Sequence, residues 1–175
     1  GDAGNKVVVE SFLQGIEVSV FAITDGENYL MLPEAKDYKR VGEGDKGLNT
    51  GGMGAVSPLP FFDEILKQKI IHRIVEPTIK GLGKDELEYR GFIFFGLMIN
   101  NGEPLVIEYN CRLGDPETEV IIPRMKNDLV ELFTAVTNGK LSEISISLDS
   151  RCAAAVVAVS GGYPGNYTKG KPIEG

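Results

Sequence analysis

The sequence predicts an α+β domain in which helices flank an antiparallel sheet. Two segments carry a hairpin signal, which is an Asp-Gly or Asn-Gly pair between stretches that alternate polar and apolar residues. A third segment between them repeats apolar residues at helical spacing. A tight turn returns the chain beside itself, so the strands of each hairpin are expected to pair antiparallel. The three segments are residues 17–32, residues 91–110 and residues 62–79.

The first part of the chain is rich in β-branched residues. Residues 7–13 form such a run and predict a short interior strand. Residues 17–23 alternate polar and apolar side chains, meet Asp25-Gly26 and continue into residues 29–32. This arrangement is the first predicted hairpin.

The middle of the chain contains the helix and the second hairpin. Residues 62–79 place their isoleucines on one face of a helix, and Pro77 is expected to kink or interrupt it. Residues 91–99 and 104–110 flank an Asn-Asn-Gly-Glu turn. They form the second predicted hairpin.

The last third adds one helix and one strand. A helix is predicted over residues 128–137, with Asn127 as its N-cap and Asn138-Gly139 as its stop. Residues 152–160 are small and apolar, and they predict a further strand.

Composition and charge limit the classes of function. The chain has 175 residues, of which 42% are hydrophobic, and a formal net charge of −7. A polyanion would be repelled by this average charge, so nucleic acid is not an expected partner. No run of eighteen apolar residues and no signal peptide are present, so no membrane association is expected. Two cysteines suit a reducing compartment, which predicts a cytoplasmic protein.

A glycine-rich segment is the first candidate for ligand binding. Six of the thirteen residues from Gly42 to Gly54 are glycine, and glycine allows backbone N–H groups to approach a phosphate or carboxylate closely. The Walker spacing of a P-loop is absent. Lys36, Lys39 and Arg40 precede the segment and could supply positive charge to the same anion. A flexible surface loop beside a solvated charged face is the alternative interpretation.

The end of the second hairpin is the second candidate. Glu108, Asn110 and Arg112 are two residues apart and therefore share one side of an extended strand. A carboxylate and an amide oxygen are ligands that magnesium takes beside phosphate groups, and a guanidinium can hold phosphoryl oxygens. The polar outer face of an edge strand is the alternative interpretation. Three further carboxylates follow, and we expect them to converge on the same site: Asp115, Glu117 and Glu119.

Four motifs occur in order along the chain. They are Val8–Glu17 (VVESFLQGIE), Asp37–Arg40 (DYKR), Asn49–Gly54 (NTGGMG) and Arg112–Glu117 (RLGDPE). Together they resemble the phosphoribosylamine-glycine ligase family, also called glycinamide ribonucleotide synthetases, of the ATP-grasp superfamily. The resemblance covers essentially the whole chain. The last motif is typical of this ligase rather than of ATP-grasp proteins in general.

The resemblance implies an enzyme that joins glycine to 5-phosphoribosylamine in purine biosynthesis, with ATP as co-substrate. Glycyl phosphate is the implied intermediate, and ADP and phosphate are the implied by-products. A magnesium or manganese ion is the implied cofactor. Positioning and charge neutralisation carry most of such a phosphoryl transfer, so no protein nucleophile is required.

The family's functional residues are carried over position by position. The backbone of Ser11, Phe12 and Leu13, with Glu10 beside it, resembles the linker that hydrogen-bonds adenine, and Glu17 matches the carboxylate that holds the ribose hydroxyls. Glu108 and Asn110 match the metal ligands, and Arg112 falls where related enzymes keep an arginine near the reacting group. The implied substrate-binding residues are Asp37, Lys39, Arg40, Asn49, Thr50, Gly51, Gly52, Asp115 and Glu117. Many relatives have a glutamate in place of Ser11 and a histidine in place of Tyr38.

The resemblance also implies that this chain is the central fragment of a larger protein. Residues 1–150 would be the C-terminal lobe of an ATP-grasp domain, and residues 151–175 would begin a β-rich C-terminal domain. The remaining domains of the parent chain are therefore expected partners, and a monomer is expected. The 175-residue chain alone is predicted to be inactive, because an ATP-grasp site holds nucleotide between two lobes. The alternatives are another ATP-grasp carboxylate-amine ligase and a non-catalytic nucleotide-binding module.

Overall fold

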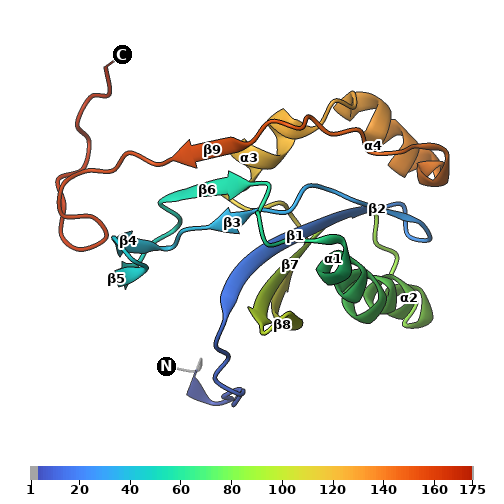
Figure 1. Ribbon diagram of the computed structural model, residues 1–175, viewed down its shortest axis with the longest axis horizontal. Coiled ribbons are helices and arrows are strands. Elements are labelled where there is room, and N and C mark those ends of the chain that lie inside the picture. The colour runs from blue at the N-terminus through green and yellow to red at the C-terminus, as the bar shows by residue number, and fades with distance from the viewer. Residues whose placement is uncertain (1–3, 175) are drawn as a thin grey trace.

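A central antiparallel sheet organises the computed structural model, which describes residues 4–174 (Figure 1). Its four strands follow the order β2-β1-β7-β8. Their bounds are β1 Ile16–Thr24, β2 Tyr29–Met31, β7 Gly91–Asn100 and β8 Glu103–Asn110. Both predicted hairpins are therefore confirmed, and the strands that open them, β1 and β7, pair with each other in the middle of the sheet.

The first hairpin turns where the sequence predicts it. Asp25 accepts hydrogen bonds from the backbone N–H groups of Glu27 and Asn28, which stabilises the reversal. Gly26 has a φ of 102°, a conformation that side chains other than glycine rarely adopt. The turn therefore depends on both residues of the Asp25-Gly26 pair.

Helices cover one face of this sheet. They are α1 Glu64–Ile70, a π-helical segment η2 Ile71–Val75 and α2 Glu76–Lys84. Their apolar side chains pack against the alternate residues of β1 and β7 that point to this side. The expected interruption is confirmed, because the α-helical hydrogen-bond pattern changes to π just before Pro77.

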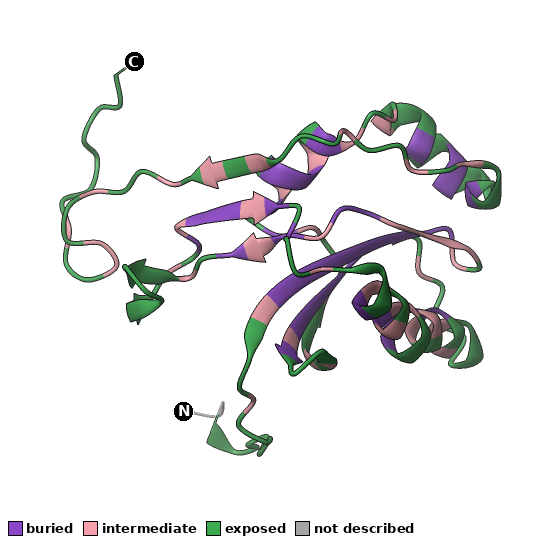
Figure 2. Cartoon of the chain, in the orientation of Figure 1, coloured by how far each residue is buried: buried purple, intermediate pink, exposed green. Residues whose placement is uncertain are grey.

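A second layer covers the opposite face. It contains a three-stranded sheet of order β3-β6-β9, with β3 Lys36–Asp37, β6 Gly54–Ser57 and β9 Ala153–Val156. Its helices are α3 Thr118–Ile121, η3 Ile122–Arg124, α4 Leu129–Asn138 and η4 Leu141–Glu143. A second apolar core lies between this layer and the central sheet, so the middle strands β1 and β7 are buried on both faces (Figure 2).

The helix predicted at residue 128 is confirmed with one correction to its start. Asp128, not Asn127, is the N-cap, because its carboxylate accepts from the N–H groups of Val130 and Glu131. Asn127 instead bonds the backbone of the segment that follows η4. Gly139 ends the helix with a φ of 66°, as predicted.

The interior strand predicted for residues 7–13 is wrong. These residues are extended but form no strand, and Val7, Val8 and Val9 are at least 80% exposed. β-branched residues favour an extended backbone, but a strand also needs a neighbouring strand to bond. Figure 2 shows this segment as an exposed arm leading to β1.

The remaining elements lie at the edge of the second layer. A small hairpin consists of β4 Arg40–Gly42 and β5 Lys46–Asn49, and its strands are exposed. The strand predicted over residues 152–160 is present but shorter, because only β9 pairs, with β6. Among the described helices, none has the length and apolar content needed to cross a lipid bilayer.

Candidate functional site

An open groove of about 710 Å³ lies at one end of the two middle strands of the central sheet, where β1 begins and β7 ends. The extended arm forms one wall, through Phe12 and Leu13, and the segment from Lys36 to Arg40 forms another. Glu17 lies between these two walls. The structure therefore brings together two of the motifs, Val8–Glu17 and Asp37–Arg40, which are separate in the sequence.

Glu17 and Lys39 form an ion pair inside this groove. The Lys39 Nζ lies 3.0 Å from Glu17 Oε2, and each side chain is 43% exposed. Burial by itself lowers the pKa of the Lys39 ammonium, but the hydrogen bond to Glu17 and the nearby carboxylates raise it overall. Lys39 therefore carries a positive charge at neutral pH and is available to an anionic ligand.

A β-bulge decides which way the second candidate site faces. Gly96 pairs with Glu108, whereas the next residue, Leu97, pairs with Val106, so Ile107 is an extra residue in β8. Without the bulge, Glu108 would share a face with Val106, which packs toward the helices α1 and α2. The bulge turns Glu108 to the opposite face.

That opposite face is the one that carries Glu17. Ser19 pairs with Gly96 across β1 and β7, so Ser19, Glu17 and Glu108 all point to the same side of the sheet. All three line a small cavity of about 20 Å³, which is also lined by Asp37 and Lys39. Glu108, which the sequence predicts as a metal ligand, therefore lies next to the groove, because Glu17, Asp37 and Lys39 line both the cavity and the groove.

Glu108 and Asn110 lie side by side, as predicted. The Asn110 Nδ2 donates to Glu108 Oε1 at 3.1 Å. Arg112 lies beyond the end of β8, and its Nη1 donates to the carbonyl of Leu113. Arg112 is exposed, so its guanidinium can still reach a ligand in front of the sheet.

The convergence expected of the three following carboxylates does not occur. Asp115 and Glu119 are exposed, whereas Glu117 is buried. Within residues 4–174 no group of three or more His, Cys, Asp or Glu side chains could hold a metal ion. A metal at this site would have to be bound by Glu108 and Asn110 together with ligands from outside the described residues. Magnesium commonly binds in that way, through one or two protein oxygens plus substrate phosphates and water.

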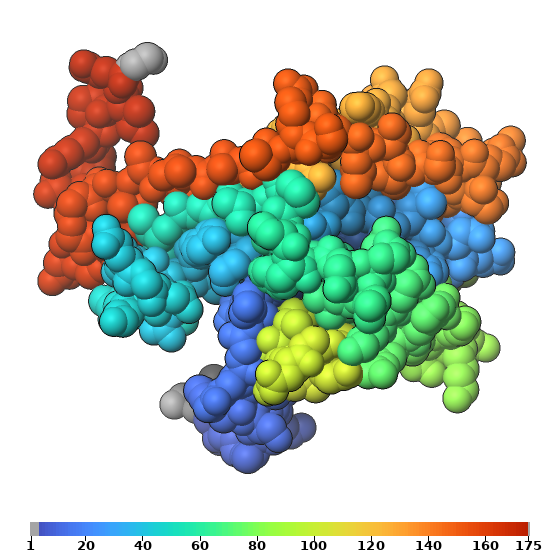
Figure 3. Space-filling view, in the orientation of Figure 1, coloured from blue at the N-terminus to red at the C-terminus, as the bar shows by residue number. Residues whose placement is uncertain are grey.

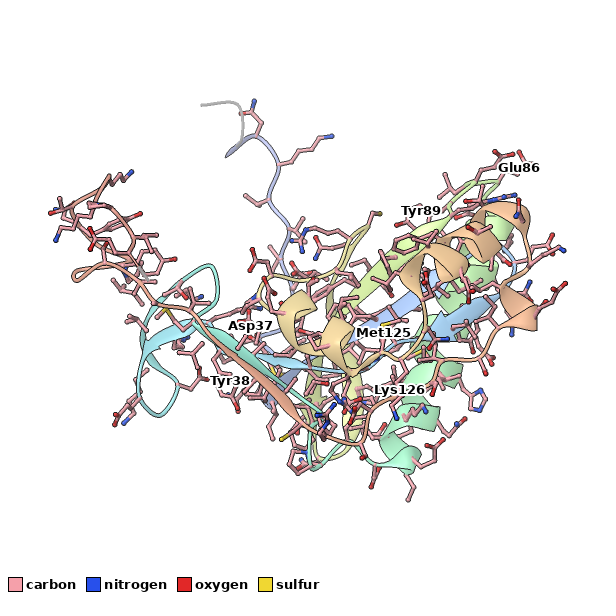
Figure 4. The ribbon with its side chains drawn as sticks, turned by 90° about the horizontal axis from the view of Figure 1, so that it is seen from above. Asp37, Tyr38, Glu86, Tyr89, Met125 and Lys126 are labelled. Atoms are coloured by element: carbon pink, nitrogen blue, oxygen red, sulfur yellow. The ribbon has the colours of Figure 1, made fainter. Side chains whose placement is uncertain are left out.

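Glu117 belongs instead to a buried polar cluster. Its Oε1 accepts a 2.6 Å hydrogen bond from the Ser19 hydroxyl, and its charge acts on Asp37. Figure 4 shows Asp37 beside the start of α3, the helix that Glu117 precedes. Sequence reasoning missed Ser19, although its position two residues after Glu17 on one strand placed it on the same face.

Asp37 is the most perturbed group of this cluster. It is 8% exposed, and no hydrogen-bond partner contacts its Oδ1 within the described part of the chain. Burial raises the pKa of this carboxyl, the charge of Glu117 raises it further, and the result is a pKa of about 6. Lys39 acts in the opposite direction.

This pKa predicts a pH dependence of stability. A carboxyl whose pKa rises from 3.8 to about 6 on folding binds more protons in the folded than in the unfolded state between those values. Its contribution to stability is therefore full below about pH 4 and is lost as the pH rises through about 6. Because Asp37→Asn cannot ionise, we expect its free energy of unfolding, relative to wild type, to increase by up to about 3 kcal/mol from about pH 4 to about pH 7.

Urea unfolding of both proteins across this pH range measures the effect. Glu119→Gln is the control, because Glu119 is an exposed carboxylate on α3, the helix that Glu117 precedes. A difference between Asp37→Asn and wild type that stays constant with pH would contradict the assignment.

The glycine-rich loop Asn49–Gly54 closes one side of the site. Thr50 holds it to the segment beside it, because both its N–H and its hydroxyl donate to the carbonyl of Lys39, at 2.7 and 2.9 Å. The N–H of Gly52 in turn donates to the Thr50 hydroxyl at 3.1 Å. The N–H of Gly51 donates to the hydroxyl of Tyr163, a residue that sequence reasoning did not select. Asn49 lines the groove, together with Arg40.

Comparison with known proteins assigns the chain to a family. A family model described as the phosphoribosylglycinamide synthetase ATP-grasp (A) domain matches residues 1–118. The chain belongs to this family. The expected ATP-grasp fold, an antiparallel sheet with flanking helices, is thereby confirmed as well.

Curated members of the phosphoribosylglycinamide synthetase family align with the whole chain. It is 49% identical over 176 aligned positions to the phosphoribosylamine-glycine ligase of Salmonella typhimurium, and 48% identical to that of Escherichia coli strain K12. The alignments include 100% of this chain but 41% of each relative. The chain therefore spans less than half the length of the family members that it matches.

Solved structures agree with the family assignment. The crystal structure of phosphoribosylamine-glycine ligase from Thermotoga maritima matches with a TM-score of 0.82 and 38% identity, over 95% of this chain and 42% of that one. The urea carboxylase of Kluyveromyces lactis matches with a TM-score of 0.59 and 17% identity, over 79% of this chain and 11% of that one. The latter likeness shows the fold alone.

Proposed function

We propose that this chain is the central part of an ATP-dependent ligase that joins glycine to 5-phosphoribosylamine and forms glycinamide ribonucleotide, ADP and phosphate. The observation that supports this most is that the β8 bulge brings Glu108 to the side of the central sheet on which Glu17 forms its ion pair with Lys39. A nucleotide that lies along the groove could then contact, one after another, the ribose-binding carboxylate Glu17, the ammonium of Lys39 and the metal ligand Glu108.

In this proposal the extended arm binds the adenine. Its backbone from Ser11 to Leu13, beside Glu10, forms no strand in the described chain, so its N–H and C=O groups are available to the edge of a base. Glu17 follows at the start of β1 and accepts from the ribose hydroxyls. Because Glu17 is half-exposed and contacts only one ammonium, it can exchange part of that contact for the sugar.

Glu108 and Asn110 are proposed to hold a magnesium or manganese ion with the nucleotide phosphates. Their donor set fits such an ion, because a carboxylate and an amide oxygen are hard ligands. The bound ion would neutralise charge on the transferring phosphoryl group. Arg112, exposed beside them, is proposed to hold the oxygens of the reacting group as charge moves.

Two steps then complete the proposed reaction. The carboxylate of glycine attacks the γ-phosphorus of ATP, which forms glycyl phosphate and releases ADP. The amine of phosphoribosylamine attacks the acyl carbon, phosphate leaves, and the amine loses a proton. Lys39 and Arg40, the Asn49–Gly52 loop and the acidic residues Asp37, Asp115 and Glu117 are proposed to bind and orient these two substrates.

The chain's larger context is part of the same proposal. We propose that residues 1–150 are the C-terminal lobe of the ATP-grasp domain and that residues 151–175 begin a further domain, although β9 already pairs with β6. Partners would be the remaining domains of the parent chain and the three small substrates. A cytoplasmic monomer is proposed, and neither nucleic acid nor a membrane is a proposed partner.

Release of ADP by the full-length protein tests this function. We expect release only when ATP, a divalent metal, glycine and freshly generated phosphoribosylamine are all present. Omission of any one of them is the control. Release without a requirement for glycine would favour another ATP-grasp ligase, and nucleotide binding without release would favour a non-catalytic module. The 175-residue chain alone is expected to release no ADP.

A further inference from the structure

The segment that follows β9 lies against the glycine-rich loop. We call residues 157–167 the strap. Figure 3 shows the C-terminal part of the chain packed beside the hairpin β4–β5, although the two are more than a hundred residues apart. Two hydrogen bonds join strap and loop: the Val157 N–H donates to the Met53 carbonyl at 2.9 Å, and the Gly51 N–H donates to the Tyr163 hydroxyl at 3.1 Å.

The strap has a defined local structure around Tyr163. Its backbone turns tightly, because the Tyr163 N–H donates to the Ser160 carbonyl and the Gly165 N–H donates to the Gly162 carbonyl. Gly162 has a φ of 97°, and a Cβ there would collide with the Asn166 carbonyl. The ring of Tyr167 packs edge-on against the Tyr163 ring, with centroids 5.5 Å apart. These contacts set the direction of the Tyr163 side chain.

The loop is held on three sides. Thr50 bonds the Lys39 carbonyl, Gly52 lies against Pro116 and Asp37, and Gly51 bonds Tyr163. The first two contacts come from elements that the proposed function already uses. The third contact comes from the strap. Two loop N–H groups donate to side chains: that of Gly52 donates to Thr50 within the loop, and that of Gly51 donates to Tyr163 of the strap.

We propose that Tyr163 is a positioning residue whose hydroxyl fixes the Asn49–Gly54 loop in its substrate-facing conformation. This inference rests on the proposed function, because it takes that loop to face the substrates of the ligase. The strap would thereby set the affinity for the substrate bound by the loop without touching the nucleotide. A loop with one fixed conformation loses less conformational entropy when a ligand binds, which favours binding.

The test uses Tyr163→Phe in the full-length protein, with Tyr167→Phe as the matched control. Both changes remove one hydroxyl from the same aromatic pair, but only Tyr163 bonds the loop. A neutral hydrogen bond contributes about 1 kcal/mol, so its loss corresponds to about a fivefold effect. We expect Tyr163→Phe to raise the KM for glycine or phosphoribosylamine about fivefold, with the KM for ATP and the kcat unchanged.

Hydrogen exchange of the peptide that contains residues 49–54 gives a second readout, which does not depend on activity. We expect about fivefold faster exchange in Tyr163→Phe and no change in Tyr167→Phe. Equal exchange in wild type and Tyr163→Phe, or an equal rise in the KM for ATP, would overturn the positioning role. An inactive wild type would refute the proposed function, and the exchange measurement would then decide whether Tyr163 fixes the loop.

Discussion

Replacement of Glu108 by glutamine is expected to lower glycine-dependent ADP release by the full-length protein roughly 10³-fold. The amide keeps the shape of the side chain but removes the negative charge that would hold a divalent ion beside Asn110. An ion that stabilises the transferring phosphoryl group lowers the activation barrier by several kcal/mol, and each 1.36 kcal/mol corresponds to about tenfold in rate. A steady-state assay of ADP at saturating magnesium measures the loss.

Glu103→Gln is the matched control for this prediction. Glu103 is a carboxylate at the start of the same strand, β8, but it forms surface ion pairs with Lys69 and Arg73 on the far side of the bulge. Exposed pairs of this kind contribute little to stability, so activity should be unchanged. If Glu108→Gln retained wild-type activity, the metal assignment would be wrong and the second hairpin would be structural only.

Replacement of Gly52 by alanine is expected to destabilise the protein by roughly 3 kcal/mol. Gly52 has a φ of 128°, which costs energy for any residue with a side chain. A Cβ at this position would also overlap Cδ of Pro116, whose ring cannot rotate away, and would lie 3.2 Å from Asp37 Oδ1. Both effects act in the same direction, and urea unfolding measures their sum.

Gly51→Ala is a control from the adjacent position. Its Cβ would meet only the Tyr163 hydroxyl, at an ordinary contact distance of 3.7 Å, and its backbone needs no positive φ. We expect a change within about 0.5 kcal/mol, because Gly51 is exposed. Equal destabilisation by both variants would mean that the loop tolerates no side chain at all, and would refute the specific clash of Gly52 with Pro116.

Local signals in the sequence were enough to predict both hairpins and the two main helices. The Asp25-Gly26 turn, the isoleucines of α1 to α2 and the glycine that ends α4 each act within a few residues of where they stand. The same signals failed for residues 7–13. A β-branched run indicates extended backbone, but a paired strand requires a partner that the run itself does not encode.

The residue types of the candidate site were also evident from the sequence, but of their grouping only the pair Glu108 and Asn110 was. Asp37 and Glu117 are eighty positions apart. Their charges come together because α3 packs on β6 and β9, and β6 pairs with β3, while Ser19 of β1 donates to Glu117. From the sequence alone, Asp37 would be assigned the ordinary pKa of an aspartate carboxyl, 3.8. Its burial, which depends on every element around it, raises that pKa to about 6.

The sequence by itself therefore determined the turns, the helix ends, the family motifs and the chemistry available at each position. The tertiary structure decided which of these residues face each other. Glu108 is the clearest example: alternation along β8 would direct it with Val106 toward the helices, and the extra residue Ile107 in the ladder with β7 reverses it toward Glu17 and Lys39. A bulge is a property of two paired strands, so its effect is not contained in the pattern of either one.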